Sequence, residues 1–153
     1  MADRGAPVKV LPPLLYAVPF ALAWLAEWRW PTSLGLGASG RVAGGLLVLS
    51  GMALMLWAFW EFRRRGTTIL PWGAATSLAT TGPYRLTRNP IYLGDALAYL
   101  GASLLLDSIW PLPLLPLIMV ANYRWVIRHE EAYLATRFGR AYAEYRLRVR
   151  RWL

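Results

Sequence analysis

The residues that could do chemistry gather in two segments of the chain, and the first surrounds Arg88. Gly82-Pro83 predicts a turn, and Asn89-Pro90 predicts the start of a helix with Asn89 as its N-cap. The N-terminus of a helix offers free backbone N–H groups and a partial positive charge, which suit a carboxylate or a phosphate. Since Arg88 adds a fixed cation, this segment could bind an anion. The alternative is an interfacial loop that only leads into a helix.

The second segment is the arginine-rich stretch 124–151, in which charged residues alternate with aromatic ones. The pattern predicts a helix with Glu130, Tyr133 and Arg137 on one face. Because Glu130 and Glu131 are neighbours on that helix, we expect at most one of them to line a site. An amphipathic helix that lies on a membrane, aromatic side chains down, is the alternative interpretation.

Apolar blocks must position these two segments. The chain has 153 residues, which predicts one domain, and only 16% of them are charged, whereas soluble domains carry about 25%. Four apolar blocks lie at about 10–28, 42–60, 91–106 and 109–127, and crossing a membrane takes about 20 apolar residues. The third is short, so we expect it to tilt little or to form a helical hairpin with the fourth around 107–113. A signal peptide is the alternative for the first block.

This pattern predicts an all-α, polytopic membrane protein. A single membrane domain over residues 1–153 would have four transmembrane helices and a cytosolic C-terminal helix at about 128–150. With four spans, only Arg29 and Arg41 of the 17 basic residues fall on one side of the membrane, and the others share the opposite side with the two termini. The positive-inside rule therefore places both termini in the cytoplasm. The net charge of +9 then favours an anionic membrane face as partner, and no nucleic acid. Arginine outnumbers lysine 16 to 1, which is typical of a GC-rich genome and favours a bacterial inner membrane.

Two kinds of site are not expected. Without cysteine and with His129 as the single histidine, the chain has neither a thiol nucleophile nor a protein-built multi-histidine centre, so no metal is predicted. Gly35, Gly37 and Gly40 match a dinucleotide-binding pattern, but they lie between two apolar blocks and not between a strand and a helix. We expect these glycines to form a turn and, with Gly44, to let helices approach closely.

Asp95 is a carboxylate a few residues inside the third apolar block, with Tyr92 and Tyr99 on the same helical face. An ionisable residue inside a membrane span is costly and is a functional candidate by default. The alternative is an interfacial carboxylate that is hydrogen-bonded to a neighbouring helix or paired with an arginine.

Together the two segments resemble the integral-membrane methyltransferases of the isoprenylcysteine carboxyl methyltransferase and phospholipid methyltransferase families. The resemblance covers about residues 65–153, and the first two blocks match only as hydrophobic helices. In order along the chain, the matching residues are Leu78, Thr80, Gly82, Pro83, Tyr84, Arg88, Asn89, Pro90, Tyr92 and Gly94, then Glu130, Glu131, Phe138, Gly139, Tyr142 and Tyr145.

The resemblance implies an S-adenosylmethionine site at the cytosolic membrane boundary, built from the Gly-Pro-Tyr loop, the start of the third span and the tail helix. The cofactor-binding residues would be Gly82, Pro83, Tyr84, Arg88, Asn89, Pro90, Tyr92, Glu130, Glu131 and Tyr142, and the catalytic ones Glu131, Arg137 and Arg146. Where members that act on prenylated proteins have histidine, this chain has Asn89, which cannot titrate, so a general base there is doubtful.

The implied acceptor is a lipophilic small molecule, a lipid or a prenylated substrate, most like the carboxylate of an isoprenylcysteine. A carboxylate needs no base, only an arginine to hold it, and Arg137 or Arg146 could do this. A phospholipid amine or a small thiol would need deprotonation by Glu130, Glu131 or more distantly His129. Outside the enzymes, a non-catalytic membrane scaffold and a transporter remain as alternatives, and the sequence does not set the oligomeric state.

Overall fold

The computed structural model describes residues 5–8, 10–68 and 73–153, and all the regular secondary structure in these ranges is helical. This confirms the all-α prediction. Two short elements are a 3-10 turn, η1, and a π-helical turn, η2. In chain order the elements are α1 (Pro12–Arg29), α2 (Gly37–Arg64), η1 (Gly82–Arg85), α3 (Pro90–Leu105), α4 (Leu114–Asn122), η2 (Tyr123–Ile127) and α5 (Arg128–Arg148).

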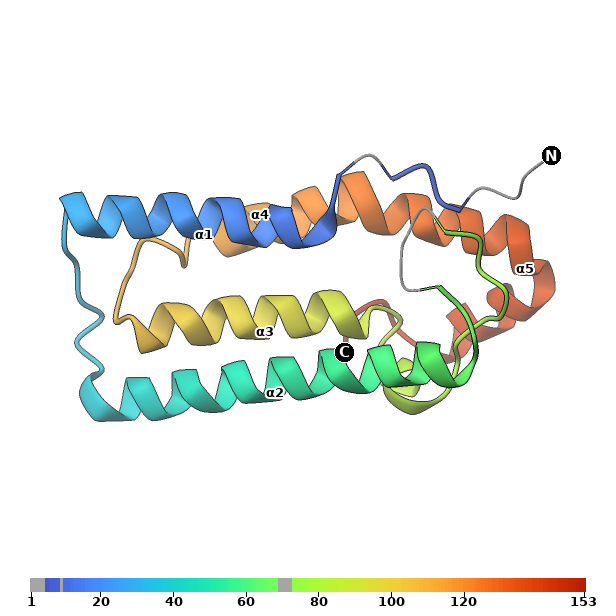
Figure 1. Cartoon of the computed structure of the whole chain (residues 1–153), viewed down its shortest axis with the longest axis horizontal. Helices are drawn as coiled ribbons and strands as arrows, with labels where there is room; N and C mark the ends of the chain where they lie inside the picture. Colours follow the sequence, from blue (N-terminus) through green and yellow to red (C-terminus); the bar gives the residue numbers. More distant parts are fainter. Residues whose placement is uncertain (1–4, 9, 69–72) are drawn as a thin grey trace.

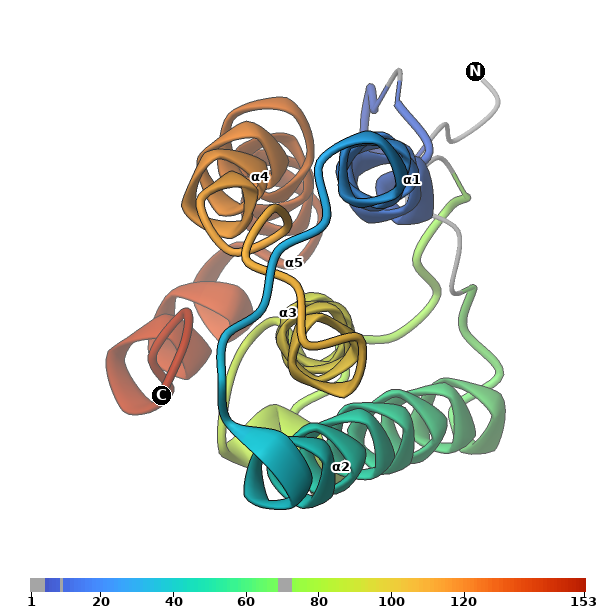
Figure 2. The same cartoon turned by 90° about the vertical axis from the view of Figure 1, so that its left-hand side faces the viewer.

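The first four long helices lie side by side, and the chain reverses direction between consecutive ones (Figure 1). Seen end-on, α3 occupies the middle of the bundle, with α2 on one side and α1 and α4 on the other (Figure 2). The most extensive contact joins α2 to α3. The bundle therefore presents one end of α3, the end near Pro90, to the loops and helix that follow α2 and α4.

Two glycine pairs let α2 and α3 touch backbone to backbone. A Cβ atom added to Gly44 would lie 2.6 Å from the carbonyl oxygen of Gly101, and one added to Gly51 would lie 2.5 Å from that of Gly94. Small residues at such crossings are typical of helices packed inside membranes. The prediction that Gly44 allows a close helix approach is confirmed.

Among the residues that the structure describes, α2 is the one helix long and apolar enough to span a membrane. Most of its apolar side chains are exposed, Val42, Leu46, Leu49 and Leu56 among them. The other predicted spans correspond to α1, α3 and the continuous α4–η2 segment, and α4 begins at Leu114 rather than near 109, after the prolines of the connection. The four-span topology therefore stays a prediction.

The C-terminal helix continues α4, as predicted, but it is not straight. The π-helical turn η2 joins α4 to α5, and such turns insert one extra residue and shift the faces of the helix that follows. Within α5, Gly139 has a φ of 48°, a left-handed conformation that costs glycine little, and the helix breaks there. The second half of α5 consequently turns back toward η1 and the start of α3 (Figure 1).

Candidate functional site

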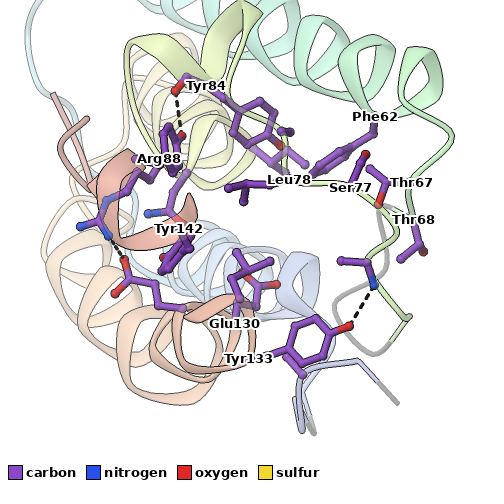
Figure 3. Close-up of a pocket in the computed structure, with 18 of the residues that line it drawn as sticks. Phe62, Thr67, Thr68, Ser77, Leu78, Tyr84, Arg88, Glu130, Tyr133 and Tyr142 are labelled. Atoms are coloured by element: carbon purple, nitrogen blue, oxygen red, sulfur yellow. Dashed lines mark hydrogen bonds and ion pairs between the residues drawn. The ribbon is translucent and has the colours of Figure 1, made fainter. Parts of the chain in front are cut away.

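A pocket lies where η1, the first turn of α3, α5 and the connection after α2 meet (Figure 3). Its cavity of about 130 Å³ is roughly ten times the space that a single buried water needs, so it is large enough for a ligand. The lining includes Phe62, Thr67, Ser77, Leu78, Tyr84, Arg88, Asn89, Pro90, Ile91, Tyr92, Glu130, Glu131, Tyr133, Leu134, Tyr142 and Tyr145, with Ala6 from the N-terminal segment.

Two arginines share one carboxylate at the polar end of the pocket. Nη1 of Arg88 lies 3.0 Å from Oε1 of Glu131, and Arg151 forms a two-pronged ion pair with the same carboxylate, Nη2 to Oε2 at 2.8 Å and Nε to Oε1 at 3.0 Å. The cluster therefore carries a net positive charge. The side chain of Arg88 is only 10% exposed, and its buried Nε has no hydrogen-bond partner among the residues that the structure describes. A buried donor without a partner is costly, and an anion in the pocket would satisfy it.

Glu130 has a different environment from its neighbour. Its Oε1 accepts a hydrogen bond of 2.7 Å from the hydroxyl of Tyr92, and none of the ion pairs within the described residues includes it. Burial raises the pKa of Glu130 to about 7, the negative charge of Glu131 adds to this, and the Tyr92 hydrogen bond opposes it. Glu131 is paired with two guanidinium groups, whereas Glu130 can take up or release a proton near neutral pH.

The residues after α5 hold the loop that carries Arg88. The backbone N–H of Arg88 donates to the carbonyl oxygen of Arg150 at 2.9 Å, and the hydroxyl of Thr87 donates to that of Arg151 at 2.8 Å. The side-chain amide of Asn89 also donates to the Arg151 carbonyl, at 3.1 Å. The chain segment around Arg150 and Arg151 therefore fixes the position of Arg88 relative to α5.

Asn89 is the residue before α3, as predicted, and Pro90 is the first residue of the helix, but the side chain of Asn89 makes no cap hydrogen bond. The predicted N-cap position is therefore confirmed, whereas the side-chain bond of a cap is not formed, and the amide nitrogen of Asn89 donates to the C-terminal segment. This bond connects the start of α3 to the segment that follows α5.

The far wall of the pocket is apolar and aromatic. Phe62, Leu78 and Leu134 pack against the buried cluster that includes Tyr84, and the Phe62 and Tyr84 rings lie 5.2 Å apart. The Tyr133 hydroxyl accepts a hydrogen bond of 3.0 Å from the backbone N–H of Ala75 and so ties α5 to the connection after α2 (Figure 3). Such a wall suits a planar or apolar ligand group, while the charged cluster lies at the other end.

Both glutamates line the pocket, which corrects the expectation that at most one would. The reason is that the pocket is enclosed from two directions: α3 approaches Glu130 through Tyr92, and the segment that follows α5 approaches Glu131 through Arg151. A straight helix with one neighbour would present only one of the two glutamates to a pocket. Because α5 is broken at Gly139, the chain after it turns back and reaches the other glutamate.

Eight of the ten residues predicted to bind a cofactor line this pocket: Tyr84, Arg88, Asn89, Pro90, Tyr92, Glu130, Glu131 and Tyr142. Gly82 and Pro83 lie behind it, where Gly82, at a φ of 60°, makes the turn that directs Tyr84 inward. The Tyr145 hydroxyl fixes this turn by donating to the Tyr84 carbonyl oxygen at 2.7 Å. The structure therefore brings the predicted cofactor-binding residues together around one pocket. That they bind a cofactor stays a prediction.

The two predicted catalytic arginines lie outside the pocket lining. Nε of Arg137 donates to the carbonyl oxygen of Ala75 at 3.3 Å, on the outer side of the wall. Arg146 places its guanidinium 5.9 Å from the centre of the Tyr142 ring. Their catalytic role stays a prediction that the pocket geometry does not favour, because among the described arginines it is Arg88 that lines the cavity.

Sequence reasoning missed Arg151, Phe62 and Ala6. The sequence marks Arg151 only as one of several basic residues in the tail, and nothing in its sequence context shows that it pairs with Glu131. Phe62 and Ala6 reach the pocket from distant parts of the chain. Asp95 lies deeper along α3 and is half-buried, and Tyr92 points its hydroxyl to Glu130 rather than to it.

The chain matches known proteins in the region that forms this site. Residues 40–141, about two thirds of the chain, match the model of the family described as phospholipid methyltransferase. The chain is 30% identical over 126 residues to the cobalt-zinc-cadmium resistance protein CzcN of Cupriavidus metallidurans, which is 82% of this chain and 51% of that protein. It is 36% identical over 72 residues to the protein-S-isoprenylcysteine O-methyltransferase of Schizosaccharomyces pombe, which is 47% of this chain and 30% of that enzyme.

A third relative is the nickel-cobalt-cadmium resistance protein NccN of Alcaligenes xylosoxydans xylosoxydans, 34% identical over 64 residues, or 42% of this chain and 30% of that protein. The chain therefore spans about half the length, or less, of these curated relatives. No solved structure matches it.

Proposed function

The chain belongs to the phospholipid methyltransferase family, and we propose that it is an S-adenosylmethionine-dependent methyltransferase of the membrane. In this proposal α1, α2, α3 and α4–η2 cross the membrane, both termini are cytoplasmic, and the pocket lies at the cytoplasmic boundary. The family match and the relative that is a protein-S-isoprenylcysteine O-methyltransferase support the activity. The exposed apolar side chains of α1 and α2 support the membrane location.

The observation that carries the proposal is Arg88. Its side chain is nine-tenths buried, lines a ligand-sized cavity and has an Nε without a hydrogen-bond partner in the described part of the chain, so it is ready for an anionic group. The methionine part of S-adenosylmethionine has a carboxylate that would pair with Arg88. Its ammonium group would donate hydrogen bonds to the carboxylate of Glu130 or Glu131. The adenosine would then lie toward Phe62 and Leu78. The charged groups at one end of the pocket and the apolar wall at the other therefore fit the cofactor.

When bound, the cofactor supplies an activated methyl group, and its transfer is an in-line displacement that mainly needs positioning and the exclusion of water. Arg88 and the aromatic wall hold and orient the reactants, while Ala6 and the buried tyrosines restrict water. A lipophilic acceptor would enter between helices and leave its polar end in the pocket.

For the acceptor, the sequence favours a carboxylate of an isoprenylcysteine-type substrate. Because the carboxylate of the cofactor would take Arg88, the holding cation would be Arg151, the other arginine that pairs with Glu131. A second candidate, an amine or thiol acceptor such as a phospholipid head group or a small thiol, is favoured by Glu130. Its carboxyl group lines the cavity, pairs with no cation within the described residues and has a pKa near 7, so it can take the proton that such an acceptor must lose.

Calorimetric titration of the protein in nanodiscs with S-adenosylmethionine and S-adenosylhomocysteine tests the proposal. We expect micromolar dissociation constants for the wild type and at least tenfold weaker binding for Arg88→Ala, since a buried charged hydrogen bond is worth about 1.5–3 kcal/mol. Arg128→Ala is the matched control, because this arginine is exposed at the start of α5 and does not line the pocket. A folded wild type that binds neither compound at millimolar concentration would refute the proposal and favour the scaffold alternative.

A further inference from the structure

A second, open pocket lies on the other side of η1, against the last turns of α2. Its walls carry Trp57, Trp60, Glu61, Arg64, Arg65 and Arg85, and its cavity volume is about 430 Å³. None of its lining residues also lines the candidate active-site pocket. The two pockets are thus separated by η1, which turns Tyr84 toward one and Arg85 toward the other.

One ion pair within this second pocket is already complete. Glu61 is buried and accepts a hydrogen bond of 2.6 Å from Nε of Arg65 and another from the Thr81 hydroxyl. Arg65 also donates to the Leu78 carbonyl oxygen at 3.1 Å and to the Thr81 hydroxyl at 2.6 Å. These bonds fix Arg65 as part of the frame and neutralise its charge.

Arg64 and Arg85 are left as exposed cations. Within the described residues neither makes an ion pair or a hydrogen bond, and Arg64 lies with its guanidinium 5.0 Å from the centre of the Trp60 ring. They come from different elements, α2 and η1, but line the same cavity. After the Glu61–Arg65 pair is neutralised, the pocket retains two positive charges, and this suits a phosphate, which guanidinium groups bind through paired hydrogen bonds.

The pocket lies at the end of the one described helix that could span a membrane by length and composition. Trp57 and Trp60 are about half exposed there, and tryptophan is enriched at the level of lipid head groups, where its ring contacts acyl chains and its N–H faces polar groups. A free anion would use the two arginines only, whereas a lipid would also cover the two exposed tryptophans.

We propose that this pocket binds the phosphodiester head group of an anionic phospholipid, with Arg64 and Arg85 on the phosphate and the tryptophans against the lipid. The bound lipid would join the end of α2 to η1 and so steady the turn that carries Tyr84. This inference rests on the proposed membrane location of α2 but not on methyl transfer, so it can fail or hold independently of the cofactor-binding result.

Native mass spectrometry of the detergent-purified protein, titrated with short-chain phosphatidylglycerol, tests this inference. We expect saturable binding of one phosphatidylglycerol, at least tenfold weaker binding of phosphatidylcholine, and at least a tenfold loss of phosphatidylglycerol affinity in Arg64→Gln/Arg85→Gln. The matched control is Arg63→Gln/Arg128→Gln, which removes two exposed arginines that line neither pocket and should change the affinity less than twofold. Retained S-adenosylmethionine binding or an unchanged helical circular dichroism spectrum shows that each variant folds.

Three outcomes would overturn the inference. Equal losses in the two double variants would mean that only overall charge matters. Equal binding of phosphatidylcholine would remove the role of anionic charge. Full displacement of the lipid by inorganic phosphate at a comparable concentration would assign the pocket to free anions.

Discussion

Replacing Glu130 with glutamine should remove the pH dependence of the unfolding free energy that the burial of this one carboxyl group causes. Burial raises its pKa from 4.5 to about 7, with a smaller contribution from Glu131. Each pKa unit corresponds to about 1.4 kcal/mol, so the charged form costs about 3 kcal/mol in the folded protein. Glutamine has the same shape and can still accept the hydrogen bond of the Tyr92 hydroxyl.

The sign follows from the direction of the pKa shift. A carboxyl group whose pKa is raised on folding leaves stability intact below pH 4.5, lowers it as the pH rises toward 7 and has its full cost above pH 7. The wild type should therefore lose about 3 kcal/mol of unfolding free energy between pH 4 and pH 8 relative to Glu130→Gln. Titrating groups that do not interact with Glu130 are common to both proteins and cancel in this difference.

Denaturant unfolding of the two proteins in the same detergent, followed by tryptophan fluorescence at several pH values, measures this difference. Glu144→Gln is the control, since Glu144 lies exposed beside Arg140 on α5 and its exposed ion pair should contribute less than about 1 kcal/mol. If the stability difference between wild type and Glu130→Gln stays constant from pH 4 to pH 8, the carboxyl group is not buried in the way the structure shows.

Two further predictions concern helix packing and the charged cluster. Gly44→Ala should lower the unfolding free energy by at least about 2 kcal/mol relative to Gly45→Ala. The added Cβ of Gly44→Ala would press on the Gly101 carbonyl oxygen, whereas the Cβ of Gly45→Ala meets open space. Equal stabilities of the two variants would contradict the backbone contact between α2 and α3. Arg151→Ala should weaken S-adenosylmethionine binding about tenfold, or about 1.4 kcal/mol, since Arg88 alone would then neutralise Glu131 and keep less charge for the ligand. Arg150→Ala leaves the backbone carbonyls and the ion pair in place and should bind normally, and equal losses in both variants would point to a general effect of tail charge.

The helical architecture could be predicted because its signals are local. The four apolar blocks correspond to α1 to α4, Pro90 begins α3, and the resemblance places eight of its ten cofactor residues around one pocket. What sequence could not supply depends on contacts between distant residues. Asn89 takes the N-cap position that its local sequence predicts, but the partner of its side-chain amide, the Arg151 carbonyl oxygen, lies 62 residues away along the chain. Similarly, Gly139 permits a helix break but does not require one.

The same distinction explains why the two adjacent glutamates acquire opposite properties. They have one side-chain chemistry and neighbouring positions on α5, so sequence alone treats them as equivalent. Tyr92 on α3 offers Glu130 a neutral hydroxyl, whereas Arg88 and Arg151 offer Glu131 two cations, and Arg151 reaches it only because the chain turns back at Gly139. The break in α5 therefore separates a carboxyl group that can exchange a proton from one that is paired with two arginines and orients Arg88. A substitution that straightens α5, such as Gly139→Ala, acts on this separation without touching either carboxylate.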